Sequence, residues 1–198
     1  MDMQNPTIHQ LAGCTFRYWK DVFPPKQCAL WFSDLMTETD WEQSEVRVYG
    51  KLHKIPRLNA WHGPNDMVYS GHRMLARPLS PLLIGIANQL LQITGEDYNS
   101  VLLNLYRNGQ DAMGWHSDDE PEFDPFASIA SFTLGGPRKF VVKERLKDGK
   151  LGDKLEWNLG GGDILVMDSP AQQKTKHSVT RTKRSVETRI NLTFRRMV

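Results

Sequence analysis

Cysteines are scarce in this sequence, and no long apolar run is present. Cys14 and Cys28 are its two cysteines, and neither belongs to a CxxC motif. This argues against a disulfide framework and fits a reducing compartment. The most apolar window, PLLIGIANQLLQI at 81–93, contains Asn88 and Gln89 and is too short to span a bilayer. Because the first ten residues also lack the basic and apolar regions of a secretion signal, we expect a cytoplasmic protein, nuclear in a eukaryote, without membrane contact.

The chain also lacks internal repeats, low-complexity tracts and long linkers. Its 198 residues, 39% hydrophobic and 24% charged, suit one soluble domain at 1–198, which we expect to be a monomer. The net charge of +2 excludes no partner, but residues 138–198 hold fifteen Lys and Arg against seven Asp and Glu. This basic portion either faces a polyanion or is a solvated surface.

Two helices precede a region of short strands. Apolar residues at helical spacing, with Pro25 and the Ser80–Pro81 pair near the starts, predict helices at 24–38 and 80–95. Strands are predicted at 45–50, 100–106, 127–135, 138–144, 153–159, 163–168, 177–180 and 189–195. No βαβ alternation follows residue 100, and GGGD at 160–163 precedes a strand, which argues against a Rossmann fold. The order predicts an α+β domain whose β part is a sandwich or jelly roll.

A histidine and an aspartate stand two positions apart in GWHSDDEPEF, at His116 and Asp118. Alternate residues of a strand share one face, so both side chains can reach one ion. His177 is the only other histidine in the β region, and two histidines with one carboxylate form the facial triad of non-haem iron(II) oxygenases. Zinc fits less well, since no cysteine is nearby and no HExxH occurs. Taken singly, each of these two histidines is at least as consistent with a surface residue as with a metal ligand.

Polar residues alternate along the last predicted strand, RINLTFR. Arg189, Asn191, Thr193 and Arg195 share one face, and burying two guanidiniums is costly unless an anion meets them. Arginine binds carboxylates through a planar two-donor fork, so a keto-dicarboxylate fits, with one end on iron and the other on an arginine. In NLY, at 104–106, an asparagine and a tyrosine repeat this spacing. The alternative is an outward-facing polar strand.

These motifs resemble the AlkB family of iron(II)- and 2-oxoglutarate-dependent nucleic-acid dealkylases. The resemblance rests on NLYRNGQDAMGWHSDDEPEF, KHSV and RINLTFR in this order, and it covers about residues 45–198. The segment VYGKLHKIPRLNAWHGPNDMVYSG is similar to the nucleotide-recognition region of the DNA-repair members. The resemblance implies a double-stranded β-helix, or jelly roll, at 96–198. It implies an N-terminal extension at 1–95 with helices and a nucleotide-recognition hairpin.

The resemblance also implies three sets of site residues. Fe(II) and catalysis are expected at His116, Asp118 and His177. The co-substrate 2-oxoglutarate is expected at Asn104, Tyr106, Arg189, Asn191, Thr193 and Arg195. Substrate contacts are expected at Tyr49, Gly50, Lys51, Arg57, Trp61, Met67, Tyr69, Asp119 and Glu120.

The activity implied is oxidative demethylation of 1-methyladenine and 3-methylcytosine in single- or double-stranded DNA, with dioxygen consumed and formaldehyde released. Such a base must be turned out of the duplex, and Tyr49 is expected to fill its place. Lys51, Lys54 and Arg57 are expected to meet phosphates. Met67 stands where several family members carry an aromatic residue, which leaves base preference open.

Two alternatives remain at the level of the sequence. One keeps the chemistry and changes the substrate to RNA, a protein side chain or a small molecule. The other is a non-catalytic nucleic-acid-binding jelly roll, which has no need for His116, Asp118, His177 and Arg189 together.

Overall fold

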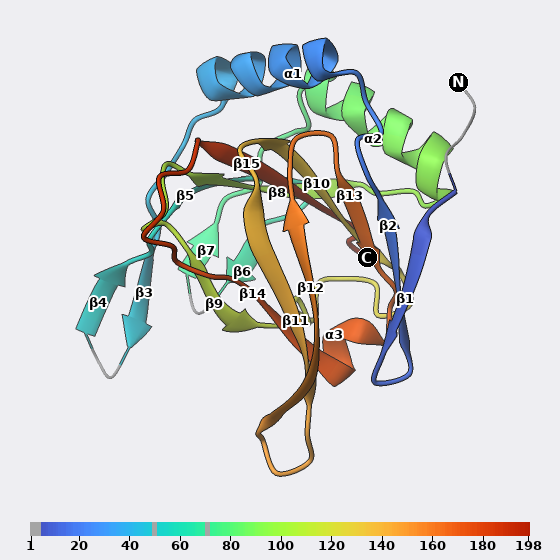
Figure 1. Ribbon diagram of the computed structural model, residues 1–198. Helices are drawn as coiled ribbons and strands as arrows, with labels where there is room; N and C mark the ends of the chain where they lie inside the picture. Colours follow the sequence, from blue (N-terminus) through green and yellow to red (C-terminus); the bar gives the residue numbers. More distant parts are fainter. Residues whose placement is uncertain (1–4, 49–50, 70–71) are drawn as a thin grey trace.

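A seven-stranded antiparallel sheet forms the centre of the molecule (Figure 1). The computed structural model describes residues 5–48, 51–69 and 72–198. In spatial order the sheet contains β1 (Thr7–Leu11), β2 (Cys14–Trp19), β13 (Ile164–Met167), β10 (Ile129–Gly135), β15 (Arg189–Arg195), β8 (Ser100–Tyr106) and β5 (Leu58–His62).

A four-stranded antiparallel sheet packs against one face of the large sheet. Its order is β12 (Leu151–Leu159), β11 (Arg138–Arg145), β14 (Thr175–Val179) and β9 (Met113–His116), which makes β9 an edge strand. A short helix, α3 (Ala171–Lys174), leads into β14. Two separate hairpins complete the strands, β3 (Glu45–Val48) with β4 (Lys51–Lys54) and β6 (Met67–Tyr69) with β7 (His72–Met74).

Two helices cover the other face of the large sheet, α1 (Pro25–Glu38) and α2 (Pro81–Thr94), as Figure 1 shows. Both predicted helices are confirmed. The Ser80 side chain accepts a hydrogen bond from the Leu83 N–H, which satisfies one of the free donors of the first turn. Gly95 ends α2 in the left-handed region at φ 75°, and its N–H donates to the Leu91 carbonyl.

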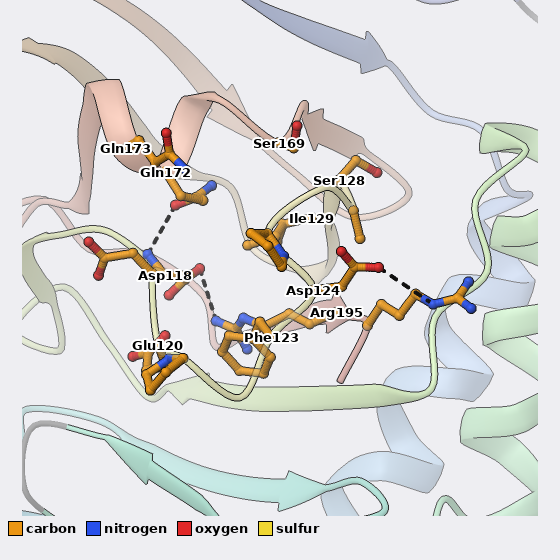
Figure 2. A pocket seen from close by; sticks show the side chains of 15 residues that line it. Asp118, Glu120, Phe123, Asp124, Ser128, Ile129, Ser169, Gln172, Gln173 and Arg195 are labelled. Carbon is orange, nitrogen blue, oxygen red and sulfur yellow. Dashed lines mark hydrogen bonds and ion pairs between the residues drawn. The ribbon is translucent and has the colours of Figure 1, made fainter. Parts of the chain in front are cut away.

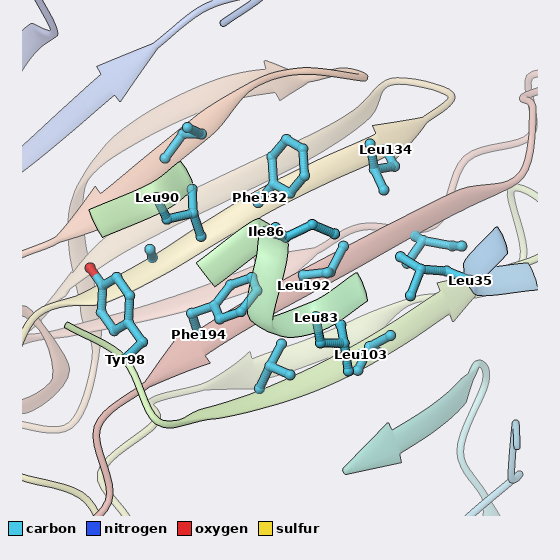
Figure 3. Close-up of a cluster of buried hydrophobic side chains, with 14 of the residues drawn as sticks. Leu35, Leu83, Ile86, Leu90, Tyr98, Leu103, Phe132, Leu134, Leu192 and Phe194 are labelled. Atoms are coloured by element: carbon cyan, nitrogen blue, oxygen red, sulfur yellow. The ribbon is translucent and has the colours of Figure 1, made fainter. Parts of the chain in front are cut away.

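The three layers enclose two apolar cores. Between the helices and the large sheet, Leu83, Ile86 and Leu90 of α2 pack on Phe132, Leu192 and Phe194 (Figure 3). Between the two sheets, Phe16 and Leu165 meet residues such as Phe140, Val142 and Leu159. The large sheet is therefore buried on both faces, which fixes the side chains of its central strands on either side.

The predicted strands form, with shifts of a few residues at their ends. The predicted strand at 45–50 is described as far as Val48, since Tyr49 and Gly50 lie outside the described residues. Seven of the described strands were not predicted, namely β1, β2, β4, β5, β6, β7 and β9. Three of them, β1, β2 and β5, precede residue 96 and belong to the large sheet, so this sheet draws strands from both sides of the expected boundary between extension and core.

Both cysteines are buried and free of disulfides, as expected. Within the described parts of the chain, no helix is long and apolar enough to cross a membrane.

Candidate metal and co-substrate site

Strands β8 and β15 turn a polar row toward the small sheet. In their antiparallel register, Arg189 lies opposite Tyr106 and Asn191 lies opposite Asn104. Their apolar neighbours, such as Leu103 and Leu192, point to the helices instead. Both faces of β15 are thus buried, and the outward-facing alternative is excluded.

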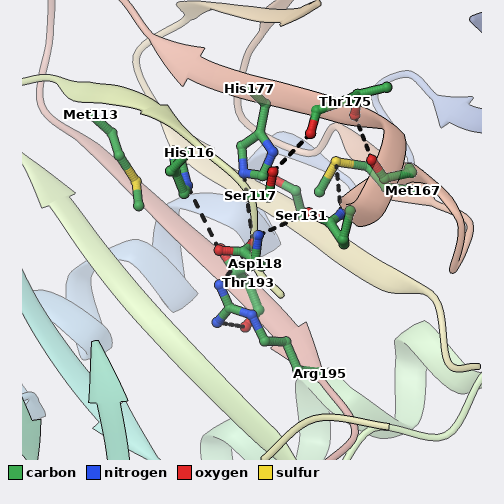
Figure 4. A network of polar contacts seen from close by, with 12 residues as sticks. Met113, His116, Ser117, Asp118, Ser131, Met167, Thr175, His177, Thr193 and Arg195 are labelled. Atoms are coloured by element: carbon green, nitrogen blue, oxygen red, sulfur yellow. Dashed lines mark hydrogen bonds and ion pairs between the residues drawn. The ribbon is translucent and has the colours of Figure 1, made fainter. Parts of the chain in front are cut away.

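Three possible metal ligands meet above this row (Figure 4). One ligand atom each from His116, Asp118 and His177 lies within 4.8 Å of the others. The two histidines come from neighbouring strands, because His116 of β9 pairs directly with His177 of β14. Their rings lie 4.1 Å apart, centroid to centroid. The sequence prediction of which residues converge is therefore supported by the geometry.

The reason for the convergence differs from the one inferred from the sequence. Strand β9 ends at His116, so Asp118 does not share a strand face with it. Asp118 lies in the following loop and is held from two directions. Its backbone N–H donates to Oε1 of Gln172 at 3.0 Å, and its Oδ2 lies 2.9 Å from Nη2 of Arg195.

The protonation of the three groups suits a divalent cation. Nδ1 of His116 lies 2.8 Å from the Gly114 carbonyl, which only accepts, so Nδ1 carries the proton and Nε2 is free to ligate. Burial lowers the pKa of His116 and lowers that of His177 to about 3, so both imidazoles are neutral at pH 7. Their Nε2 atoms lie 3.7 and 3.6 Å from the Asp118 oxygens, too far for hydrogen bonds.

The Asp118 carboxylate also has an oxygen that could bind a cation. Burial alone would raise its pKa, but the Arg195 guanidinium beside it holds the pKa well below its usual range. The carboxylate is therefore charged, and its buried Oδ1 has no hydrogen-bond partner among the described residues. A buried charged oxygen without a partner is costly, and a cation between the three side chains removes that cost. The donor set fits Fe(II).

Arg189 provides the second half of the site. Its Nη2 donates to Thr133 Oγ1 at 2.9 Å and to Asn191 Oδ1 at 2.7 Å. Its buried Nε and Nη1 find no hydrogen-bond partner within the part of the chain that the structure describes. Burial lowers its pKa to about 10, so the guanidinium remains charged at neutral pH. A buried cation with free donors is a site for a carboxylate.

The structure adds residues that the sequence reasoning missed. Ser131 Oγ donates to Asn191 Oδ1 at 2.9 Å, and with Thr133 it extends the polar row onto β10. Arg138, 2% exposed, donates to the carbonyls of three loop residues, and its guanidinium lies 5.6 Å from the Tyr106 ring. Ser131 and Thr133 stand at alternate positions in IASFTLG, which was a usable signal. Nothing local marked Arg138 or Gln172.

Two cavities adjoin at the triad. The smaller, of about 20 Å³, lies among the co-substrate residues and the two histidines. The larger, of about 210 Å³, is walled by Glu120, Phe123 and residues of the α3 region (Figure 2). Asp118 and Arg195 line both cavities. Burial and the nearby Asp118 raise the pKa of Glu120 to about 7, which makes its carboxyl sensitive to a neighbouring cation.

The expected substrate residues divide into exposed and buried groups. Lys51 and Asp119 are exposed, and Glu120 is half-buried. Arg57 is 3% exposed, and its Nε donates to Asn104 Oδ1 at 2.7 Å. This guanidinium lies in the interior beside the co-substrate row, so the expected phosphate contact is corrected: Arg57 fixes the orientation of an amide instead.

The two residues expected near the lesion are also internal. Trp61 and Met67 are 2% and 1% exposed and belong to one apolar cluster with Phe123. The Trp61 Nε1 donates to the Asn65 carbonyl at 2.9 Å, which holds the ring in this cluster. The expectations for Tyr49 and Gly50 fall outside the described residues, as does the side chain of Tyr69.

Comparison with known proteins identifies the class. Residues 15–195 match the model of the 2OG-Fe(II) oxygenase superfamily. The solved structure of OsALKBH1 superposes with a TM-score of 0.64 at 16% identity, covering 96% of this chain and 100% of that one, which supports the fold.

More similar relatives narrow the family. The alpha-ketoglutarate-dependent dioxygenase alkB homolog 3 of Bos taurus is 35% identical over 83% of this chain and 59% of its own length. The DNA oxidative demethylase ALKBH2 of Mus musculus is 34% identical over 78% of this chain and 67% of its own length. The protein belongs to the AlkB family of 2OG-Fe(II) oxygenases. It spans about three-fifths to two-thirds of the length of these curated relatives.

The expected family, jelly-roll fold and enzyme class are thereby confirmed. The family implies Fe(II), 2-oxoglutarate and dioxygen, and the triad and the Arg189 row are the residues of this chain that fit the first two.

Proposed function

We propose that this protein removes N-methyl groups from bases such as 1-methyladenine and 3-methylcytosine in DNA. The proposal rests chiefly on one observation: the His–Asp–His triad lines a cavity together with Asn191, which accepts a hydrogen bond from the buried, incompletely bonded Arg189. Relatives named as a DNA oxidative demethylase and an alkB homolog support the choice of a methylated nucleic acid.

The bound metal, 2-oxoglutarate and dioxygen supply the oxidising chemistry. In it 2-oxoglutarate becomes succinate and carbon dioxide, one oxygen atom enters the methyl C–H bond, and the hydroxymethyl product loses formaldehyde. The protein contributes position and charge. His116, Asp118 and His177 hold the metal, and Arg189 takes the distal carboxylate of the co-substrate with support from Tyr106 and Asn191.

Glu120 is proposed to recognise the base. Its carboxyl lies in the wall of the 210 Å³ cavity, which shares Asp118 with the metal site. 1-Methyladenine and 3-methylcytosine carry a positive charge, so a carboxylate here stabilises them relative to the neutral base. Asp119 adds a second negative charge at the rim.

Two basic surfaces are candidates for phosphate contact. Lys51 and Lys54 are exposed on the β3–β4 hairpin. A groove of about 420 Å³ is lined by Lys139 of β11 and by Arg181 and Arg184, which belong to the basic stretch that follows His177. We propose that both meet substrate phosphates. A monomer working in the cytoplasm, or in the nucleus of a eukaryote, is part of the same proposal.

The test is a turnover assay with matched substrates. The protein receives Fe(II), 2-oxoglutarate and air with 1-methyladenine or 3-methylcytosine in single- and double-stranded DNA, and with the same bases in RNA. Formaldehyde and the restored base, measured by mass spectrometry, are expected with DNA, and His116→Ala is the inactive control. If methylated bases in RNA are turned over and those in DNA are not, RNA is the substrate in place of DNA. Metal binding without any turnover refutes dealkylation.

A further inference from the structure

The outer face of the four-stranded sheet carries an aromatic and basic surface that the metal site does not use. Phe140 and Val142 of β11 point into the core between the sheets. Because side chains alternate along a strand, Lys139, Val141 and Lys143 point away from that core. On β9, His116 faces the metal site, so its neighbour Trp115 lies on the outer face, where it is 40% exposed.

Lysines from three neighbouring strands line up across this face. In the register of the sheet, Lys143 of β11 lies opposite Lys154 of β12 and opposite Lys176 of β14. Directly opposed like charges destabilise an antiparallel pair. Lys154 is neutralised by Glu156 at 2.9 Å. In the described residues, neither Lys143 nor Lys176 has an acidic partner within ion-pair distance.

Trp115 of β9 lies close to one lysine of this row. The Lys143 Nζ lies 5.5 Å from the centroid of the Trp115 ring, so the ring and the ammonium form one continuous surface. Lys176 lies opposite Lys143 on β14, the strand between β11 and β9, so the second lysine belongs to the same face as the ring. Exposed aromatic rings among cations are the means by which proteins bind single strands, since bases stack on the ring while phosphates meet the cations.

The surface lies just behind the metal site. Trp115 precedes His116 and Lys176 precedes His177, so the same two strands carry a metal ligand on one face and this surface on the other. β9 is an edge strand, and the Ala112 N–H just before it donates to the Pro56 carbonyl just after β4. Figure 1 shows β9 on the side of the small sheet nearer the β3–β4 hairpin. A strand that passes the hairpin can cross the β9 edge onto the outer face.

We propose that Trp115, Lys143 and Lys176 bind the single-stranded flank of the nucleic-acid substrate, with a base stacked on Trp115 and phosphates on the two lysines. The assignment rests on the proposed function for the identity of the substrate. It extends that function by giving the enzyme a preference for single-stranded over fully paired flanks.

Binding is tested without turnover, so that the two proposals fail separately. The probe is a labelled, unmethylated single-stranded DNA of about sixteen nucleotides, followed by fluorescence anisotropy. Trp115→Ala is expected to weaken binding roughly ten-fold, and Trp115→Phe to restore most of it. The double variant Lys143→Gln/Lys176→Gln is expected to reduce the slope of log affinity against log salt by about 1.4. Lys26→Gln, at an exposed position of α1, is the charge control.

The outcomes discriminate clearly. Unchanged binding in Trp115→Ala and in the double lysine variant overturns the proposal, whether or not the protein turns over methylated bases. Weaker binding in the lysine variant alone, with Trp115→Ala unaffected, also overturns the proposal. Phosphate contacts then account for the binding, and a duplex backbone can supply these as well. Folding of each variant is checked by its thermal midpoint and by its affinity for Mn(II).

Discussion

The guanidinium of Arg195 lies 2.9 Å from Oδ2 of Asp118, and the two side chains are only 3% and 2% exposed. The sequence assigned Arg195 to the co-substrate and Asp118 to the metal. The ion pair joins these two functions, because it ties the end of β15 to the loop that carries the metal-ligating carboxylate. Arg195 also stacks on Phe123, 5.2 Å from its ring centroid, which fixes the guanidinium from the other side.

Breaking this pair is expected to be costly. Arg195→Met leaves a buried carboxylate without its partner, so the free energy of unfolding falls by about 3–5 kcal/mol. Added Mn(II) recovers part of the loss, because the metal replaces the missing positive charge. Urea unfolding with and without Mn(II) measures both effects. An equal loss when the change is made in an Asp118→Asn background rules out the pair as the cause.

Gln172 is expected to control metal affinity without touching the metal. Its side chain holds the Asp118 N–H, and Gln172→Leu leaves that buried donor unpaired and the loop free to shift. Affinity for Mn(II), measured by calorimetry, should fall about 10–100-fold. The exposed neighbour Gln173 gives the matched control, and Gln173→Leu should leave the affinity near that of the unmodified protein. Equal effects in the two variants contradict the assignment.

Arg189 is expected to act on the co-substrate rather than on the metal. Arg189→Met removes a charge-assisted pair worth roughly 1.5–3 kcal/mol, so 2-oxoglutarate binding should weaken by about one to two orders of magnitude. Mn(II) affinity should change little. Arg189→Lys keeps the charge but loses the planar fork, and an intermediate affinity is expected. Anaerobic titration with 2-oxoglutarate makes the measurement, and unchanged affinity in Arg189→Met refutes the role.

Arg138 is expected to influence the co-substrate site from a greater distance, by positioning Tyr106. Its guanidinium stacks near Tyr106 and fixes three loop carbonyls, so Arg138→Met should let the phenol move. We expect a several-fold rise in KM for 2-oxoglutarate with a smaller change in kcat, because the residue does not touch the reacting atoms. A fall confined to kcat contradicts this positioning role.

Alkaline pH should unfold the protein through a buried phenol far from the metal. Burial raises the pKa of Tyr98 to about 12, against an opposing hydrogen bond with Ser128. A raised folded-state pKa means that the stabilisation is complete below pH 10 and is lost as pH rises toward 12, by up to about 3 kcal/mol. Urea midpoints between pH 9 and 12 should show this slope, and Tyr98→Phe should reduce it. Burial also raises the pKa of Tyr18, which accounts for a remaining slope.

Much of the site was predictable because it lies on strongly patterned strands. Alternation in RINLTFR and NLY placed the co-substrate row on one face, and the register of β8 and β15 brings its members together. The two helices followed from their apolar stripes and from the start signals at Pro25 and at the Ser80–Pro81 pair. These features depend on local sequence, and local sequence determines them well.

Several of the unpredicted features depend on distant pairing. Strand β2 pairs with β13, which lies far along the chain, and Arg17 of β2 is opposite Val166 of β13. Arg57 reads as a surface cation in a basic hairpin, yet folding brings it beside Asn104 in the interior. The meeting of His116 and Asp118 was predicted from strand periodicity, but a loop held by Gln172 brings it about. Periodicity describes one element at a time and does not show which loop closes on which.

The position of β15 in the large sheet has a consequence for how the chain is made. β15 lies between β10 and β8, and it follows both of them in the sequence. Until it is inserted, the sheet is two unconnected pieces, one of four strands and one of two. A nascent chain that has emerged only as far as β14 therefore lacks a continuous large sheet. It also lacks Arg189 and Arg195, the two arginines of β15. Contacts between residues as distant as Tyr106 and Arg189 form slowly, and the catalytic site cannot be complete until β15 pairs with β8.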